Sequence, residues 1–303
     1  MSEMSRPLPS SGPSGVPGWS GTPTGKQLLS ATWGLLKQDR ELFILPVLGT
    51  VFGVIAGVVL FVPGFALGYA VTGDLEHQLP YVVGGFLFTL GATFAAIFFQ
   101  AALVIGAMQR ADGGDPTLSG VLGAAWRLKG KIFGWALLTT IVGTALRVAE
   151  ERLGFLGKVV SFVGGLAWAI ASFLAVPVLV AEGLGPIDAV KRSGQLIKAT
   201  WGTSLRTTLR FSVIQFLLFL PVLAVGVVGV LLIASGSGTG IGLGAVLLAL
   251  AVIGIIALAI TFSAVTTYAR ALIYRYATGL PTPGIDAGLF AGAFRPKGRK
   301  RFA

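Results

Sequence analysis

The chain has 303 residues, of which 54% are hydrophobic and only 12% are charged, and its formal net charge is +11. A soluble globular domain carries about 25% charged residues, and a core this apolar would leave too little polar surface to cover it in water. This composition excludes a water-soluble globular protein and predicts that lipid surrounds much of the chain. The sequence has no cysteine, which excludes disulfides, thiol nucleophiles and thiolate metal sites.

The first segment, residues 1–22, is rich in proline, glycine and serine and contains no apolar run. A signal peptide needs an apolar region near its start, so this segment is not expected to be one. We predict a disordered N-terminal tail in the cytoplasm. Residues 23–280 form the predicted transmembrane domain, and residues 281–303 form a predicted basic cytoplasmic tail.

Six stretches are long and apolar enough to cross a bilayer, which takes about 20 residues in a helix. In chain order the predicted spans are 42–69, 81–108, 132–146, 159–180, 211–233 and 241–264. The third is the shortest and is bounded by Lys131 and Arg147. The predicted fold class is therefore all-α, a polytopic membrane protein with six transmembrane helices.

The basic residues indicate how these spans are oriented, because cytoplasmic loops of membrane proteins collect Lys and Arg. With six spans and a cytoplasmic N-terminus, only Arg147, Arg152 and Lys158 of the 23 basic residues fall on the outer side. An odd number of spans would break this pattern. We therefore predict a protein of the bacterial cytoplasmic (inner) membrane with both termini in the cytoplasm.

Three tryptophans mark a repeat on the predicted inner side. Trp33 and Trp201 both lie in the tetrapeptide Ala-Thr-Trp-Gly, and Trp126 follows two alanines. A Pro-Thr pair ends nine residues before Trp33 and nine residues before Trp126. Since a predicted span begins shortly after each tryptophan, we predict a threefold repeat, in which each unit is a short amphipathic helix followed by a two-span hairpin.

The second of these short helices illustrates the predicted placement. Its apolar residues follow helical spacing, at Leu118, Val121, Leu122, Ala125 and Leu128. Asp115 is predicted to accept hydrogen bonds from N–H groups of its first turn. An apolar face beside Trp and basic residues favours a helix in the inner membrane interface. The alternative is an inner loop that packs against the bundle. The candidate interfacial anchors are Trp33, Trp126, Trp201, Lys191 and Arg192.

Four stretches resemble an uncharacterised bacterial family of six-span membrane proteins, a domain of unknown function. They are residues 36–42 (LKQDREL) with Pro46, 177–186 (PVLVAEGLGP), 189–193 (AVKRS) and 271–277 (ALIYRYA). The similarity extends over about residues 26–297. The layout is more distantly similar to the membrane domain attached to some glycerophosphoryl diester phosphodiesterases. The resemblance implies the six-span fold and no catalytic residue, because the phosphodiesterase domain itself is absent.

No combination of residues in the sequence predicts a catalytic, cofactor-binding or metal-binding site. His77 is the one histidine, and we expect it in a solvated outer loop, since a metal site needs more ligands. Glu182 follows the fourth predicted span, and we expect Lys191 or Arg192 to pair with it at the membrane edge.

Inside the predicted spans the notable polar residues are Gln100 and Gln215, and we expect them to bridge helices more often than bind substrate. The near absence of ionisable groups there counts against a proton- or sodium-coupled pump. Gly49, Gly53 and Gly57 form a ridge that allows close helix contact, which we expect within the chain in preference to a dimer.

These observations predict a non-enzymatic integral membrane protein with a scaffolding, assembly or membrane-organising role and no cofactor. The alternative is a transporter or carrier of an apolar or lipid-like substrate. A cavity lined by Gln100, Gln215 and hydroxyls would favour the carrier, and a filled bundle with an exposed apolar flank would favour the scaffold. The expected partners are anionic lipid headgroups, attracted by the basic tail, and an unidentified protein, with no nucleic acid.

Overall fold

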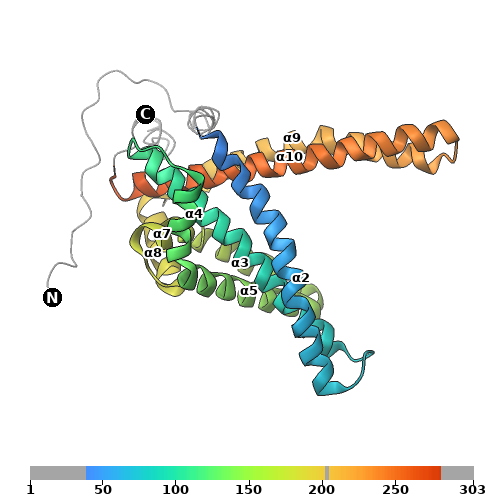
Figure 1. Ribbon diagram of the computed structural model, residues 1–303, viewed down its shortest axis with the longest axis horizontal. Helices are drawn as coiled ribbons and strands as arrows, with labels where there is room; N and C mark the ends of the chain where they lie inside the picture. Colours follow the sequence, from blue (N-terminus) through green and yellow to red (C-terminus); the bar gives the residue numbers. More distant parts are fainter. Residues whose placement is uncertain (1–38, 202–204, 281–303) are drawn as a thin grey trace, which may run out of the picture.

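The computed structural model describes residues 39–201 and 205–280. Within these ranges it does not describe the side chains of Arg40 and of residues 199–218. All regular structure in these residues is helical, which confirms the all-α prediction (Figure 1). In chain order the helices are η1 (Arg40–Phe43), α2 (Ile44–Thr72), α3 (Gln78–Ala111), α4 (Leu118–Arg127), α5 (Lys129–Arg152), α6 (Gly154–Ala171), α7 (Ala175–Glu182), α8 (Pro186–Trp201), α9 (Leu205–Ala234) and α10 (Gly238–Ala277).

Five segments of this described part are long and apolar enough to cross a membrane, as expected of a multi-pass membrane protein. They are α2 with most of η1, α3, α5, α6 together with α7, and α10. The fifth predicted span, 211–233, falls on α9, a helix of 30 residues. Its described side chains begin at Phe219, so they cover a shorter apolar stretch, Phe219–Ala234.

Helices α2 and α3 form the most closely packed pair, joined by a short turn. The glycine ridge of α2 lies against α3: Gly49 and Gly53 are buried, and a Cβ on Gly57 would come within 2.8 Å of the Phe88 ring. The ridge therefore packs within the chain, as the sequence predicted. His77 is exposed in the turn, and its Nδ1 accepts a hydrogen bond from the Leu79 N–H at 3.0 Å, which caps the start of α3.

The short helix α4 begins one connection after α3, and its first turn differs from the prediction. Thr117, and not Asp115, caps the helix, because its hydroxyl accepts a hydrogen bond from the Gly120 N–H at 3.3 Å. Asp115 instead binds Arg110 at the end of α3. The prediction for Asp115 was wrong because a strong cation lay within reach, and a charge-assisted bond is stronger than a cap to a neutral N–H.

The fourth predicted span is interrupted between α6 and α7. Pro177 has no N–H to donate back to the preceding turn, which explains why the helix does not run on unbroken. The N–H of Leu174, at the start of α7, donates to the hydroxyl of Ser193 at 3.0 Å. Ser193 lies on α8 and is fully buried, so α8 supplies the bond that the interrupted helix lacks.

Helices α9 and α10 form a long two-helix arm that extends away from the rest of the molecule (Figure 1). Small residues face each other inside the arm: a Cβ on Gly229 would lie 2.9 Å from the carbonyl oxygen of Gly244. The outer side of α10 carries exposed aliphatic side chains, among them Leu243, Leu250 and Ile253. The buried residues of α10 concentrate in its last part, from Phe262 onward, where it enters the bundle.

Candidate functional site

Polar side chains gather where the C-terminal part of α10 meets the start of η1, the end of α3 and the α7–α8 connection. We call this group the polar network; its members are Asp39, Arg110, Asp112, Asp115, Glu182, Arg192, Tyr268, Tyr274 and Arg275. The turns at the tips of the α2–α3 and α9–α10 hairpins point away from it (Figure 1). The network therefore marks one end of the molecule.

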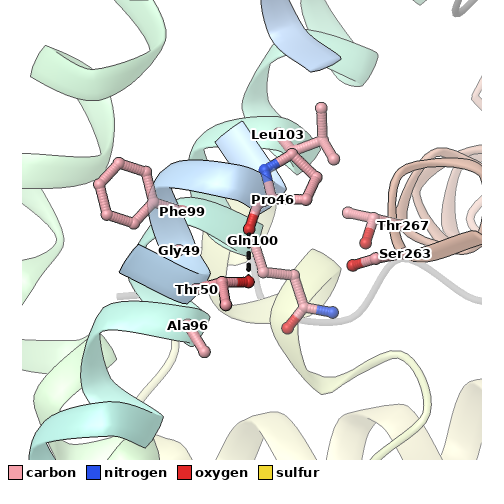
Figure 2. A pocket seen from close by; sticks show the side chains of 9 residues that line it. All are labelled: Pro46, Gly49, Thr50, Ala96, Phe99, Gln100, Leu103, Ser263 and Thr267. Carbon is pink, nitrogen blue, oxygen red and sulfur yellow. Dashed lines mark hydrogen bonds between the residues drawn. The ribbon is translucent and has the colours of Figure 1, made fainter. Parts of the chain in front are cut away.

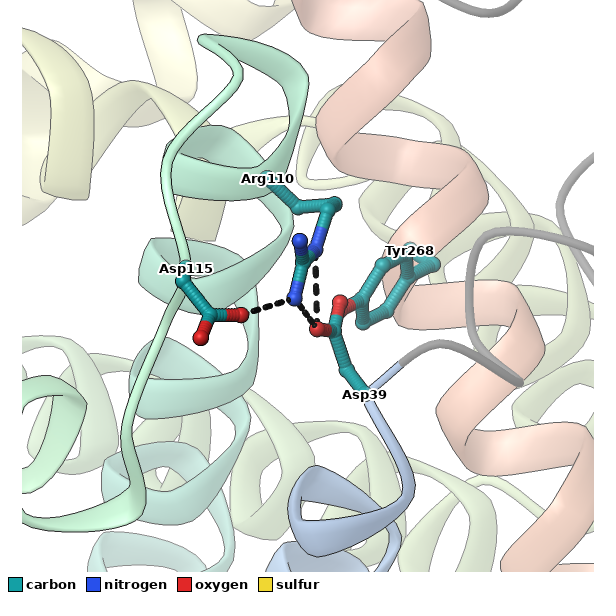
Figure 3. Close-up of polar contacts among 4 residues, drawn as sticks. All are labelled: Asp39, Arg110, Asp115 and Tyr268. Carbon is teal, nitrogen blue, oxygen red and sulfur yellow. Dashed lines mark hydrogen bonds and ion pairs between the residues drawn. The ribbon is translucent and has the colours of Figure 1, made fainter.

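Asp39 is the most buried acid of the network, with a side chain only 1% exposed (Figure 3). One carboxylate oxygen accepts a hydrogen bond from Arg110 Nε at 2.8 Å, and the other accepts one from the Tyr268 hydroxyl at 2.7 Å. Arg110 also binds the exposed carboxylate of Asp115 at 2.6 Å. The buried charge is thus both neutralised and hydrogen-bonded, which is the condition for keeping a carboxylate away from water.

Two further carboxylates are held by α10 in the same way. Arg275, nearly buried, binds Asp112 at 2.6 Å and lies 3.5 Å from the carbonyl oxygen of Met108. Tyr274 donates its hydroxyl to Glu182 at 3.0 Å, and Arg192 Nε lies 3.2 Å from both oxygens of that carboxylate. Three acids at helix ends, Asp39, Asp112 and Glu182, are therefore each bound by an α10 side chain.

A small cavity lies next to the network, between α2, α3 and α10 (Figure 2). We call it the junction cavity; its volume is about 140 Å³. Its lining consists of Pro46, Gly49, Thr50, Ala96, Phe99, Gln100, Leu103, Ser263 and Thr267. The polar atoms facing it are one amide and three hydroxyls, and no lining residue is charged.

The structure places some of the predicted site residues and leaves others undescribed. Gln100 lies in the lining of the junction cavity. Trp126 is 58% exposed on α4, with Lys129 Nζ 4.6 Å from its ring centroid. Trp33 and the side chains of Gln215 and Trp201 lie outside the described residues.

The two basic anchors predicted on α8 have different partners. Arg192 pairs with Glu182, which confirms one of the two pairings expected for that acid. Lys191 is exposed and lies 3.8 Å from Asp188 on the same helix. The sequence interpretation missed the burial of Asp39, and it gave no role to Arg110, Tyr268 or Tyr274.

Within residues 39–201 and 205–280, no three His, Cys, Asp or Glu side chains are grouped so that they could hold a metal ion. The network pairs its acids with arginines and tyrosines. Through these bonds the network ties the start of η1, the end of α3, the α7–α8 region and α10 together at one end of the bundle.

Comparison with known protein families gives a match. The chain matches the Family of unknown function (DUF6159) over residues 79–282, from the start of α3 to just past the end of α10. This confirms the resemblance to a domain of unknown function, over a shorter part of the chain than the sequence predicted. The chain matched neither a curated protein nor a solved structure.

Proposed function

Since the chain belongs to the Family of unknown function (DUF6159), we propose its role from its geometry: a non-enzymatic integral protein of the bacterial cytoplasmic membrane that scaffolds, assembles or organises other membrane components. The helices expose long apolar faces on α2, α6 and α10, and the polar network holds them together at one end. Such a molecule offers the membrane a shaped apolar surface.

The size of the junction cavity is the observation that carries this proposal. The junction cavity has a volume of about 140 Å³. Sites for drug-sized ligands have volumes of about 300–1,000 Å³ and bury most of the ligand. A carrier would need to enclose its substrate, and the junction cavity is too small to enclose a whole lipid. Scaffolding needs only the outer surface.

We propose six spans with both termini in the cytoplasm, the polar network being on that side. Helix α9 has 30 residues and would be about 45 Å long, against about 30 Å for the hydrocarbon core. Its described part is apolar, and it runs beside α10. An α9 that crosses the membrane gives the even number of spans that the basic residues favour.

We also propose the threefold repeat of a short inner helix followed by a two-span hairpin. Two such helices, α4 and α8, precede α5 and α9, and the hairpin α2–α3 would be the first of the series. Their tryptophans, with Lys191 and Arg192, would lie at the headgroups of anionic lipids, and the basic tail would add to this attraction.

A carrier of an apolar or lipid-like substrate is the second candidate. One specific observation favours it: Gln100 and three hydroxyls converge on the junction cavity. The layout also resembles, more distantly, the membrane domain attached to some glycerophosphoryl diester phosphodiesterases. This resemblance is consistent with a carrier, because such a domain would contact lipid.

Mass spectrometry of the chain extracted with its native lipid into nanodiscs tests the choice. A scaffold predicts a protein partner at a fixed stoichiometry that does not change with expression level. An unrelated multi-pass protein, extracted in parallel, identifies background proteins. A small molecule or lipid enriched far above the bulk membrane, with no protein partner, would contradict scaffolding and favour the carrier.

A further inference from the structure

The junction cavity contains polar groups that the protein itself does not satisfy. Among the described residues, the side chains of Gln100, Ser263 and Thr267 make no hydrogen bond. Thr267 is only 3% exposed, and it contributes its hydroxyl to the cavity lining. Where lipid takes the place of water, a polar group without a hydrogen-bond partner costs free energy. This cost is an argument for a partner from outside the chain.

The unsatisfied groups converge on one space. Figure 2 shows Ser263 and Thr267, both on α10, pointing toward the amide of Gln100 on α3. Thr50 completes the polar side, although its hydroxyl already donates to the Pro46 carbonyl oxygen at 3.0 Å and can only accept further bonds. The set offers both donors and acceptors, which suits carbonyl and hydroxyl oxygens.

The lining also sets the charge and size of an occupant. No lining residue is charged, and the nearby Asp39 and Arg110 already neutralise each other, so a charged group would find no counter-ion. The volume, about 140 Å³, is close to the ~150 Å³ of an apolar cavity that holds benzene. The cavity therefore fits a neutral head of about one six-membered ring or one glycerol ester.

The cavity opens toward apolar surface. Thr50 and Ser263 are exposed at its edge, whereas Gly49, Phe99, Leu103 and Thr267 are buried behind them. On α2 the face of Thr50 continues, one and two turns on, as the exposed Val54 and Val58. On α10 the face of Ser263 continues toward the arm as the exposed Ile256 and Val252.

We propose that the junction cavity binds the uncharged, oxygen-bearing head of a membrane amphiphile, with its apolar tail along the exposed faces of α2 and α10. Diacylglycerol and isoprenoid quinones share this chemistry. The proposal goes beyond the scaffolding role, and it concerns binding alone, so it holds for a scaffold as well as for a carrier.

Retention of defined amphiphiles tests the site. The purified chain is placed in phosphatidylcholine nanodiscs that contain dioleoylglycerol, a ubiquinone or phosphatidylglycerol, and adducts are counted by native mass spectrometry. We expect about one dioleoylglycerol or ubiquinone per chain. Whichever of these two amphiphiles is retained identifies the class of the ligand. Preferential retention of phosphatidylglycerol, or no retention of any amphiphile, would overturn the proposal.

Variants connect retention to the cavity. Gln100→Leu and Thr267→Val each remove polar atoms with little change of shape, and each should lower retention about tenfold, because about one hydrogen bond is lost. The matched controls are Gln109→Leu on α3, which is exposed, and Thr261→Val on α10, whose hydroxyl bonds its own helix at Ala257. Equal retention by cavity and control variants would contradict the site.

Ser263→Leu gives a second check that does not depend on the folding of a buried variant, since Ser263 is exposed at the cavity edge. The larger side chain should block entry and abolish retention while the unfolding transition stays unchanged. Failure of this test leaves the protein-partner measurement unaffected, so the two proposals fail separately.

Discussion

The side chain of Asp39 shows how single residues hold this protein together. It is almost completely buried, and it is bound by Arg110 from the end of α3 and by Tyr268 from α10. Removing one partner of a buried ion pair costs far more than the pair contributes as a whole, because the other charge is left uncompensated. Here Asp115 also binds Arg110 and moderates that cost.

Asn at position 39 keeps the shape of the side chain and removes its charge. We expect Asp39→Asn to lower the free energy of unfolding by about 2 kcal/mol, the typical loss of a hydrogen bond to a charged group. The measurement is an SDS titration of the protein in mixed micelles. Asp115→Asn is the control: its carboxylate is 88% exposed, so the change should stay below about 1 kcal/mol. Equal effects of the two variants would contradict a special role for the buried acid.

The network could be predicted from the sequence only where its partners are close together in the chain. Glu182 and Arg192 are 10 residues apart and bracket one loop, so their pairing was predicted. Asp39 lies 71 residues from Arg110 and 229 from Tyr268. Its neighbours in the sequence are also charged, and nothing local distinguishes it from a solvated interface residue. Only the packing of α10 against η1 and α3 selects it.

Among the elements, α3 approaches a neighbouring helix closely. A Cβ placed on Gly91 would lie 2.6 Å from the carbonyl oxygen of Ala56 on α2, and a backbone atom cannot move aside alone. The other face of α3 is more open, since a Cβ on Gly85 would meet nothing within 4 Å. The two glycines therefore provide a matched pair on one helix.

We expect Gly91→Ala to push α2 and α3 apart and to cost about 1–3 kcal/mol of unfolding free energy, as overpacking does. Gly85→Ala should be neutral or stabilise by up to about 1 kcal/mol, because Ala favours helix over Gly. Thermal unfolding in detergent compares them. If Gly91→Ala were as stable as Gly85→Ala, the close contact of α2 with α3 would be wrong.

The break between α6 and α7 depends on α8. The buried Ser193 hydroxyl accepts the Leu174 N–H, and Ser193→Ala should cost about 1–3 kcal/mol because that N–H is left unpaired. Ser172→Ala is the control, since the Ser172 hydroxyl only bonds within its own turn, to the Trp168 carbonyl oxygen. The same unfolding assay measures both variants, and similar losses would show that α8 does not support the break.

The break itself escaped prediction because apolar periodicity does not register it. Residues 159–180 contain no charged residue and are mostly hydrophobic, and Pro177 lies near the end of that run. The bonding of Leu174 depends on a serine 19 residues later. Five of the six predicted spans coincide with long apolar helical segments of the described residues, because local composition determines them. An interruption that another helix stabilises was not predicted.

At the scale of the whole molecule, helix lengths divide the protein into an apolar part and a polar end. Helix α10 has 40 residues and is about 60 Å long, about twice the hydrocarbon thickness of a bilayer. Its first part is exposed and apolar, and its last part binds the three acids of the network. We infer that the last part lies at or beyond the membrane surface, where it joins the connecting segments of the other spans.

We therefore propose a six-span protein with its polar network on the cytoplasmic side. Because the chain has no cysteine, a single introduced cysteine is the only thiol that can react with a label. The exposed positions Asp74, Ser235 and Asp188 are suitable. They lie in the α2–α3 turn, after the end of α9 and on α8, respectively.

Labelling with a membrane-impermeant maleimide on intact spheroplasts is the most direct measurement. Asp74→Cys and Ser235→Cys should react from outside, and Asp188→Cys should react only after the membrane is permeabilised. If Ser235→Cys also required permeabilisation while Asp74→Cys did not, α9 would not cross the membrane, and both the six-span topology and the cytoplasmic position of the network would be contradicted.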